Sequence, residues 1–181
     1  MTTRICTLAL MAPGLLLLGA CSASEDGTSA RSQETSQSLA AMLADKEGLD
    51  KTAAAMRETG IIQVFDEAAY YTLLAPTDAA FAAQGEMTIE DADQEAALAA
   101  VLRDHILPGY LTSEDIAQAI ADSGDGSVEI QTMGQQKLAF SMDGDVVQVR
   151  TTDGQVASLL AGEGQASNGV VIPVDAVLKQ L

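Results

Sequence analysis

Residues 72–81 read Thr-Leu-Leu-Ala-Pro-Thr-Asp-Ala-Ala-Phe, which is typical of a strand that turns directly into a capped helix. Pro76 biases the residue before it toward extended geometry. Thr77 can accept a backbone N–H as the N-cap, and Asp78 is favourable in the first helical turn. Phe81 then returns an aromatic side chain to the core. The stretch therefore predicts a strand, a sharp junction and a helix.

Two further stretches follow, Leu-Arg-Asp-His-Ile-Leu-Pro-Gly at 102–109 and Ser-Asn-Gly-Val-Val-Ile-Pro-Val-Asp-Ala-Val-Leu at 167–178. With the first stretch they resemble the three boxes of the fasciclin (FAS1) domain family. These boxes read Ala-Pro-Thr-Asp/Asn-x-Ala-Phe, Leu-x-Tyr-His-Val-Val-Pro-Gly and Ala/Ser-Asn-Gly-Val-Ile-His-Val-Ile-Asp-x-Val-Leu. The resemblance implies mainly structural roles for the matching residues, which are Pro76, Thr77, Asp78, Phe81, His105, Asn168, Gly169 and Asp175.

The chain departs from the family pattern at positions that matter for binding. Asp104 replaces the usual Tyr of the middle box, and Ile172 replaces the His of the last box. In some animal fasciclin proteins, integrin binding has been attributed to an Asp-Ile pair before the last box and to the Tyr-His pair. The matching positions here are Glu163-Gly164 and Asp104-His105, and Arg-Gly-Asp is absent. Integrin recognition is therefore not expected.

The N-terminus resembles the signal peptide of a bacterial lipoprotein. An apolar run at 8–18 is too short to span a bilayer, and it is followed by Leu-Gly-Ala-Cys at 18–21. This resembles a lipobox and implies lipid attachment at Cys21 after removal of residues 1–20. An ordinary signal peptide with an incidental cysteine is the alternative. Ser22 resembles the pattern sorted to the outer membrane, so we expect a lipid-anchored protein of the bacterial cell envelope.

Composition divides the rest of the chain into two parts. Residues 21–37 are rich in Ser, Thr, Gln and Glu, which predicts a flexible polar tether. Residues 38–181 fit one fasciclin-like domain. The only cysteines are Cys6 and Cys21, so the mature domain has no disulfide and no cysteine nucleophile.

The chain is strongly acidic, with 26 Asp and Glu against 9 Lys and Arg and a formal net charge of −17. Phosphate backbones and anionic headgroups repel such a surface, which excludes nucleic acid as a partner. The charge serves solubility or adaptation to salt, or alternatively provides a surface for cations.

The periodicity of apolar residues changes along the domain. Helical spacing recurs at 39–56, 94–102 and 112–120, with Thr112 or Ser113 as a possible cap of the last helix. After Gly126 the period becomes two, which predicts half-buried antiparallel strands. Helices followed by strands give an α+β domain. The family resemblance refines this to a β-sandwich or wedge of two sheets flanked by N-terminal helices.

Three residues of the last box carry local expectations. Asn168-Gly169 tolerates positive φ, which would turn the chain into the last strand. Asp175 closes that strand. Pro173 lacks an N–H, so its segment should be an edge strand or bulged. Methionines are expected to fill gaps in or near the core, namely Met42, Met56, Met87, Met133 and Met142.

Candidate chemistry is sparse. His105, the single histidine, lies next to Asp104, which permits an acid–base interpretation. However, neighbouring strand residues point to opposite faces, and the family resemblance suggests a structural histidine instead. No nucleophile elbow, zinc-hydrolase helix or phosphate loop occurs, and the acids at 122–125 and 143–145 lack EF-hand spacing. We therefore expect no catalytic residues, metal or cofactor.

The resulting hypothesis is a non-enzymatic, lipid-anchored envelope module for cell adhesion or protein and glycan interaction. Its partners would be the membrane, through lipidated Cys21, and an unknown extracellular or envelope protein or glycan. The alternative is a carrier or sensor of a small apolar ligand between helices and sheet, because some fasciclin-type proteins bind carotenoids. The low aromatic content of 3%, without Trp, argues against a carrier. An enzyme ranks third.

Overall fold

Helices occupy most of the first half of the domain. The computed structural model describes residues 36–66, 69–85, 91–134 and 136–179, so the expected signal peptide, Cys21 and most of the tether lie outside the described residues. The helices are α1 (Leu39–Asp45), α2 (Asp50–Glu58), the 3₁₀ helix η1 (Ile61–Asp66), α3 (Asp78–Gln84), α4 (Ala92–Arg103) and α5 (Ser113–Asp122).

The strands form two four-stranded sheets. The first, ordered β2–β1–β8–β7, contains β1 (Tyr71–Pro76), β2 (Ile106–Pro108), β7 (Gly164–Ala166) and β8 (Gly169–Val174). The second, ordered β3–β4–β5–β6, contains β3 (Ser127–Gln131), β4 (Lys137–Asp143), β5 (Val146–Thr151) and β6 (Val156–Ser158). Paired strands run antiparallel except β1 and β8, which run parallel. The predicted α+β architecture of two sheets with N-terminal helices is confirmed.

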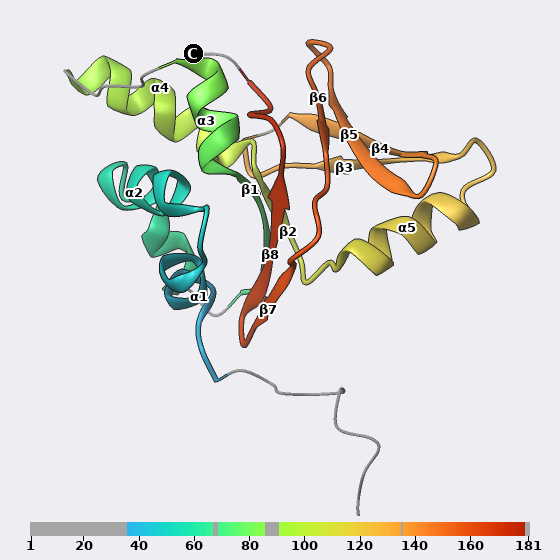
Figure 1. Ribbon diagram of the computed structural model, residues 1–181, viewed down its shortest axis with the longest axis horizontal. Coiled ribbons are helices and arrows are strands. Elements are labelled where there is room, and N and C mark those ends of the chain that lie inside the picture. Colours follow the sequence, from blue (N-terminus) through green and yellow to red (C-terminus); the bar gives the residue numbers. More distant parts are fainter. Residues whose placement is uncertain (1–35, 67–68, 86–90, 135, 180–181) are drawn as a thin grey trace, which may run out of the picture. The chain divides into compact units, whose positions relative to one another are not determined.

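The first sheet is a middle layer that is buried on both faces. Leu73 of β1 belongs to the apolar cluster under the helices, whereas its neighbour Leu74 belongs to the cluster facing the second sheet. Val171 and Val170 of β8 divide in the same way. Figure 1 shows α1, α2 and α4 on one side of this sheet, and β3–β6 with α5 on the other. Burial on both faces explains why β1 and β8 are apolar without alternation.

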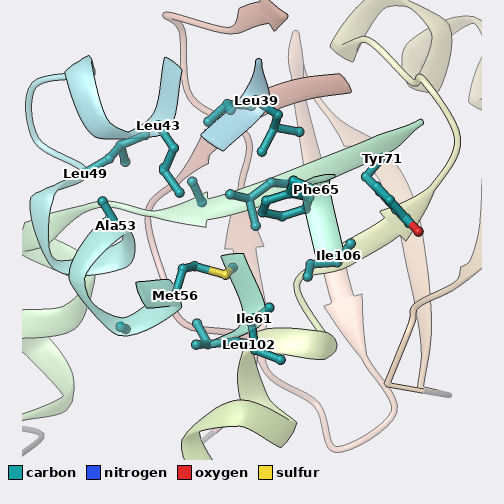
Figure 2. Packing of buried hydrophobic residues seen from close by; sticks show 14 of the residues in the cluster. Leu39, Leu43, Leu49, Ala53, Met56, Ile61, Phe65, Tyr71, Leu102 and Ile106 are labelled. Carbon is teal, nitrogen blue, oxygen red and sulfur yellow. The ribbon is translucent and has the colours of Figure 1, made fainter. Parts of the chain in front are cut away.

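Side chains fill the space between the helices and the first sheet (Figure 2). Phe65 of η1 lies edge-on to Tyr71 of β1, with ring centroids 5.9 Å apart. The fully buried members of this cluster include Leu39, Leu43, Leu49, Met56, Phe65, Leu73, Leu102 and Ile106. Each such side chain contributes roughly 1.5–3 kcal/mol relative to exposure, so this cluster attaches the helical layer to the sheet.

Threonine side chains cap the N-termini of α3 and α5. Thr77 accepts a hydrogen bond from the Ala80 N–H and starts α3 as predicted. For α5 the cap is Thr112, and it forms a reciprocal capping box with Asp115. Hydrogen bonds from Thr112 hold the pKa of Asp115 below its usual value. The choice left open by the sequence is therefore settled in favour of Thr112.

Gly169 is required for a reason other than the predicted one. The Asn168-Gly169 pair was expected to allow positive φ in the turn, but Gly169 is not among the glycines with positive φ, so the prediction is wrong at Gly169. A Cβ atom at this position would instead collide with the backbone oxygen of Tyr71 and with the side chain of Leu39. Glycine is needed because β1 and α1 approach the start of β8 too closely for any side chain.

Pro173 lies in a central strand, so the expectation of an edge strand is wrong. β8 pairs with β1 along its whole length, with Pro173 opposite Ala75. The backbone edge of Pro173 that lacks an N–H faces away from β1 and lies beyond the end of β7, so the β1 and β7 pairings do not need this donor. On the same edge, the Pro173 carbonyl accepts from the Leu160 N–H at 2.8 Å. A proline at this place removes no bond between β1 and β8.

The methionines divide between the core and the surface. Met56 is fully buried and Met42 packs partly buried against the same cluster, as expected. Met133 and Met142 are exposed, so their assignment to the core or its margin is wrong. Met87 lies outside the described residues. The alternating pattern places Met142 in β4, but Met142 lies next to the turn between β4 and β5, where its side chain is 41% exposed.

Asn168 connects three segments that are far apart in the sequence. Its Oδ1 accepts from the Leu39 N–H of α1 at 2.7 Å, and its Nδ2 donates to the Phe65 carbonyl of η1 at 2.6 Å. Its backbone carbonyl also accepts from the Tyr71 N–H at the start of β1. Next to it, Ser167 N–H donates to the carbonyl of Gln37, the last residue of the expected tether. The turn between β7 and β8 therefore attaches to the helical layer.

Asn168→Ala should destabilise the protein by about 3 kcal/mol, because it removes both side-chain bonds and leaves the Leu39 N–H and Phe65 carbonyl without them. Urea unfolding followed by circular dichroism measures the change. Ser167→Ala is the matched control: its hydroxyl bond to Gln37 is exposed, and it should cost at most about 0.5 kcal/mol. Equal effects of the two substitutions would contradict the assigned role of Asn168.

Candidate functional site

The junction after β1 joins two helices. Asp78 lies in the first turn of α3 as predicted, but its Oδ1 accepts from the Lys51 N–H at 2.9 Å, at the start of α2. Its own N–H donates to the Gly48 carbonyl at 2.8 Å. Pro76 accepts from the Thr52 hydroxyl through its carbonyl. The carboxylate of Asp78 therefore accepts a hydrogen bond from the N-terminus of α2, although Asp78 itself belongs to α3. The local sequence pattern does not indicate this contact.

Phe81 and Asp175 also make internal contacts. Phe81 is buried in a small cluster with Val101 and Val177. Asp175 Oδ1 accepts from the Ser158 N–H at 2.6 Å, and the Asp175 N–H donates to the Ser158 carbonyl. Asp175 therefore joins the end of β8 to the end of β6, and so connects the two sheets.

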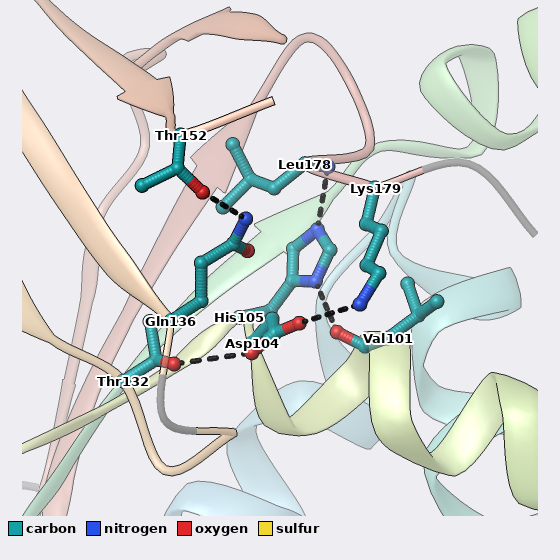
Figure 3. A network of polar contacts seen from close by, with 8 residues as sticks. All are labelled: Val101, Asp104, His105, Thr132, Gln136, Thr152, Leu178 and Lys179. Atoms are coloured by element: carbon teal, nitrogen blue, oxygen red, sulfur yellow. Dashed lines mark hydrogen bonds and ion pairs between the residues drawn. The ribbon is translucent and has the colours of Figure 1, made fainter. Parts of the chain in front are cut away.

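His105 is fully buried, and both of its ring nitrogens are hydrogen-bonded (Figure 3). Nδ1 donates to the Val101 carbonyl at 2.9 Å, and Nε2 accepts from the Leu178 N–H at 3.1 Å. Burial lowers the pKa of His105 from 6.5 to about 4, against the raising effects of the Val101 carbonyl and of Asp104. The ring is thus neutral at pH 7 and joins α4 to the segment after β8. This geometry provides no accessible acid or base.

Asp104 is buried beside the histidine but belongs to a different element than expected. Both residues were expected on a strand, whereas Asp104 is the C-cap of α4 and β2 begins only at Ile106. Its carboxylate accepts from the Thr132 hydroxyl at 3.2 Å and lies 3.6 Å from the ammonium of Lys179 (Figure 3). Asp104 therefore holds the loop after β3 and the C-terminal segment against the end of α4.

Glu163 is occupied within the domain as well. Its Oε2 accepts from the Ser113 N–H at 2.6 Å, at the start of α5, and its Oε1 accepts from the Gln165 side chain. A carboxylate at a helix N-terminus is favourable because it satisfies a free N–H and complements the helix dipole. The position that matches the integrin-associated pair of some relatives is therefore structural in this chain.

The surface of the domain has two adjacent hollows. The first, of about 630 Å³, lies between the start of α5, the β4–β5 turn and the β6–β7 connection. The second, of about 600 Å³, lies between the loop before α2, the start of α3 and the same connection. Residues 160–162 line both, so they form a ridge between them. We call this surface the two hollows.

The two hollows combine exposed apolar side chains with acidic ones. Met142, Val146 and Leu160 line the first and are 41%, 44% and 37% exposed. The acidic residues are Glu114, Asp145 and Glu163 in the first hollow and Asp45, Glu47 and Asp78 in the second, where Lys46 is the one cation in the lining. Sequence reasoning did not identify this surface, because single apolar residues at hairpin ends carry no pattern of their own.

The described part of the chain contains no group of three or more His, Cys, Asp or Glu placed to hold a metal ion. Within the same residues, no helix has the length and apolar character needed to cross a membrane.

Comparisons with known proteins agree with this geometry. The family model described as fasciclin domain matches residues 47–180. Protein sll1483 of Synechocystis sp. (strain ATCC 27184 / PCC 6803 / Kazusa) is 23% identical over 148 residues, which cover 80% of this chain and 74% of that protein. A solved FAS1 domain pair from the insect cell adhesion molecule Fasciclin I shares the fold, with a TM-score of 0.60 and 21% identity. That match covers 72% of this chain and 45% of the pair.

The buried histidine should make stability fall in mild acid. Because the pKa of His105 is about 4 in the folded protein and 6.5 unfolded, its neutral form favours folding above pH 6.5. That contribution, on the order of 3 kcal/mol, is lost as the pH falls from about 6.5 to 4. Urea unfolding at several pH values measures it, with His105→Gln as the comparison, since glutamine does not titrate. Identical pH dependence of the two proteins would show that His105 does not titrate on unfolding.

Proposed function

Because the chain belongs to the fasciclin domain family, we propose that it is a non-enzymatic, lipid-anchored module of the bacterial cell envelope that mediates adhesion through protein or glycan contacts. The fasciclin domain is associated with cell adhesion and protein interaction. The observation that carries the proposal is that the family-motif side chains make their contacts within the domain. His105 in particular is fully buried with both ring nitrogens hydrogen-bonded, so it is not an accessible acid–base group. Such a molecule can hold a partner without changing it.

Lipid attachment at Cys21 is the second part of the proposal. It is supported by the Leu-Gly-Ala-Cys sequence at 18–21 after an apolar run that is too short to span a bilayer. Acylation would hold the domain at the outer membrane, because buried acyl chains contribute about 0.8 kcal/mol per CH₂ and two or more chains anchor stably. Residues 21–37 would give the domain its reach from the membrane.

The carrier alternative receives less support from the structure. A small apolar ligand was expected between helices and sheet, and this space is occupied by side chains such as Met56, Phe65 and Leu102 (Figure 2). The two hollows lie on the surface and are rimmed by carboxylates. An apolar ligand would lie there against charged groups, which disfavours its transfer from water.

Cys21→Ala should abolish lipidation and release the protein from the membrane fraction, and cells that carry it should adhere as poorly as a deletion strain. Metabolic labelling with a radioactive fatty acid, membrane fractionation and a surface-attachment assay measure the three effects. Cys6→Ala is the matched control, because it removes the other cysteine and should leave labelling and adhesion unchanged. Unaltered adhesion of the deletion strain in several assays would refute the adhesive function.

A further inference from the structure

The two hollows have the chemistry of a peptide-binding surface. Their lining combines uncovered apolar side chains, Met142, Val146 and Leu160, with carboxylates on both sides of the ridge 160–162. Transfer of an apolar side chain from water into either hollow is favourable in free energy, and the carboxylates of the rim attract positive charge. Since the ridge separates two depressions that share their central residues, an occupant of both must be elongated.

We propose that the two hollows bind an extended segment of a partner protein in which Lys or Arg residues alternate with apolar ones. This inference rests on the proposed function and names the class of partner that the adhesive surface takes. Alternation suits the site because successive side chains of an extended segment point to opposite sides. When the apolar set enters the hollows, the other set emerges from the surface, and the long stems of Lys and Arg can bend back to the rim carboxylates.

The charges on this surface favour that occupant over others. Glu114, Asp145 and Glu47 are exposed rim residues, and the lining of the first hollow contains no Lys or Arg. A second copy of the chain would bring a net charge of −17 to an acidic rim, and an anionic membrane surface would be repelled in the same way. A neutral glycan would leave the rim carboxylates without counter-charges.

The apolar side chains and the rim can be tested separately with a synthetic probe. The probe is a short fluorescent peptide in which lysine alternates with leucine, and its binding to the purified protein is measured by anisotropy at low and high salt. The combined substitution Glu47→Gln, Glu114→Gln and Asp145→Asn should weaken binding about tenfold at low salt and much less at high salt. Leu160→Ser with Val146→Ser should weaken it about tenfold at both.

Matched variants elsewhere on the surface control for charge and for exposed apolar area. Glu58→Gln, Asp125→Asn and Asp153→Asn remove the same number of exposed carboxylates away from the hollows, and Met133→Ser removes an exposed apolar side chain. These variants should bind the probe as the wild type does. Equal weakening by the control set would overturn the proposal. So would equal binding of peptides in which lysine alternates with glycine or glutamate alternates with leucine.

Attachment assays with the combined variant Glu47→Gln, Glu114→Gln and Asp145→Asn, which we call the rim variant, separate this inference from the proposed function. If cells with wild-type protein adhere and cells with the rim variant adhere equally well, the two hollows are not the adhesive surface, although the adhesive function stands. If the rim variant loses adhesion and the control set keeps it, the inference is supported. Self-association of the wild type that Leu160→Ser abolishes would assign the surface to a second copy and overturn the proposal.

Discussion

The parallel pairing of β1 with β8 is the constraint on which the rest of the structure depends. It joins residues 71–76 to residues 169–174, so a long stretch of chain must fold between two strands that lie side by side. Closing such a loop costs entropy before any contact is gained. Fixed points occur at both ends of the pair: Asn168 binds α1 and η1 at one end, and His105 binds the Leu178 N–H beyond the other.

Local chemistry was predictable from the sequence, whereas pairing between distant segments was not. The cap at Thr77 and the half-buried strands after Gly126 follow from neighbouring residues, and the α+β class follows from their order. The central place of β8 depends on a partner in the first half of the chain, so Pro173 suggested an edge. Gly169 suggested a turn conformation for the same reason, because the crowding by Tyr71 and Leu39 is a tertiary effect.

The candidate binding surface was less predictable than the fold, and the reason is physical. Motif residues are recognisable because each has a fixed internal partner, as Asp78 has in Lys51 and Asp175 in Ser158. A surface that binds another molecule has no such partner within the chain. Met142 and Leu160 look like ordinary core residues in sequence, and only the positions of the hairpin end and the β6–β7 connection show that they are uncovered.

The acidic character of the protein and its apolar hollows act over different distances. At physiological salt the Debye length is about 8 Å, so the net charge repels anionic surfaces and attracts cationic ones without distinguishing among cationic partners. In the proposed interaction, discrimination comes from contacts at van der Waals distance with exposed side chains of the hollows such as Val146 and Leu160. Charge would then set mainly the association rate, and the contacts in the hollows mainly the dissociation rate. Because exposed lining residues such as Asp145, Val146 and Leu160 are not family-motif residues, both properties can change at these positions without altering the motif contacts.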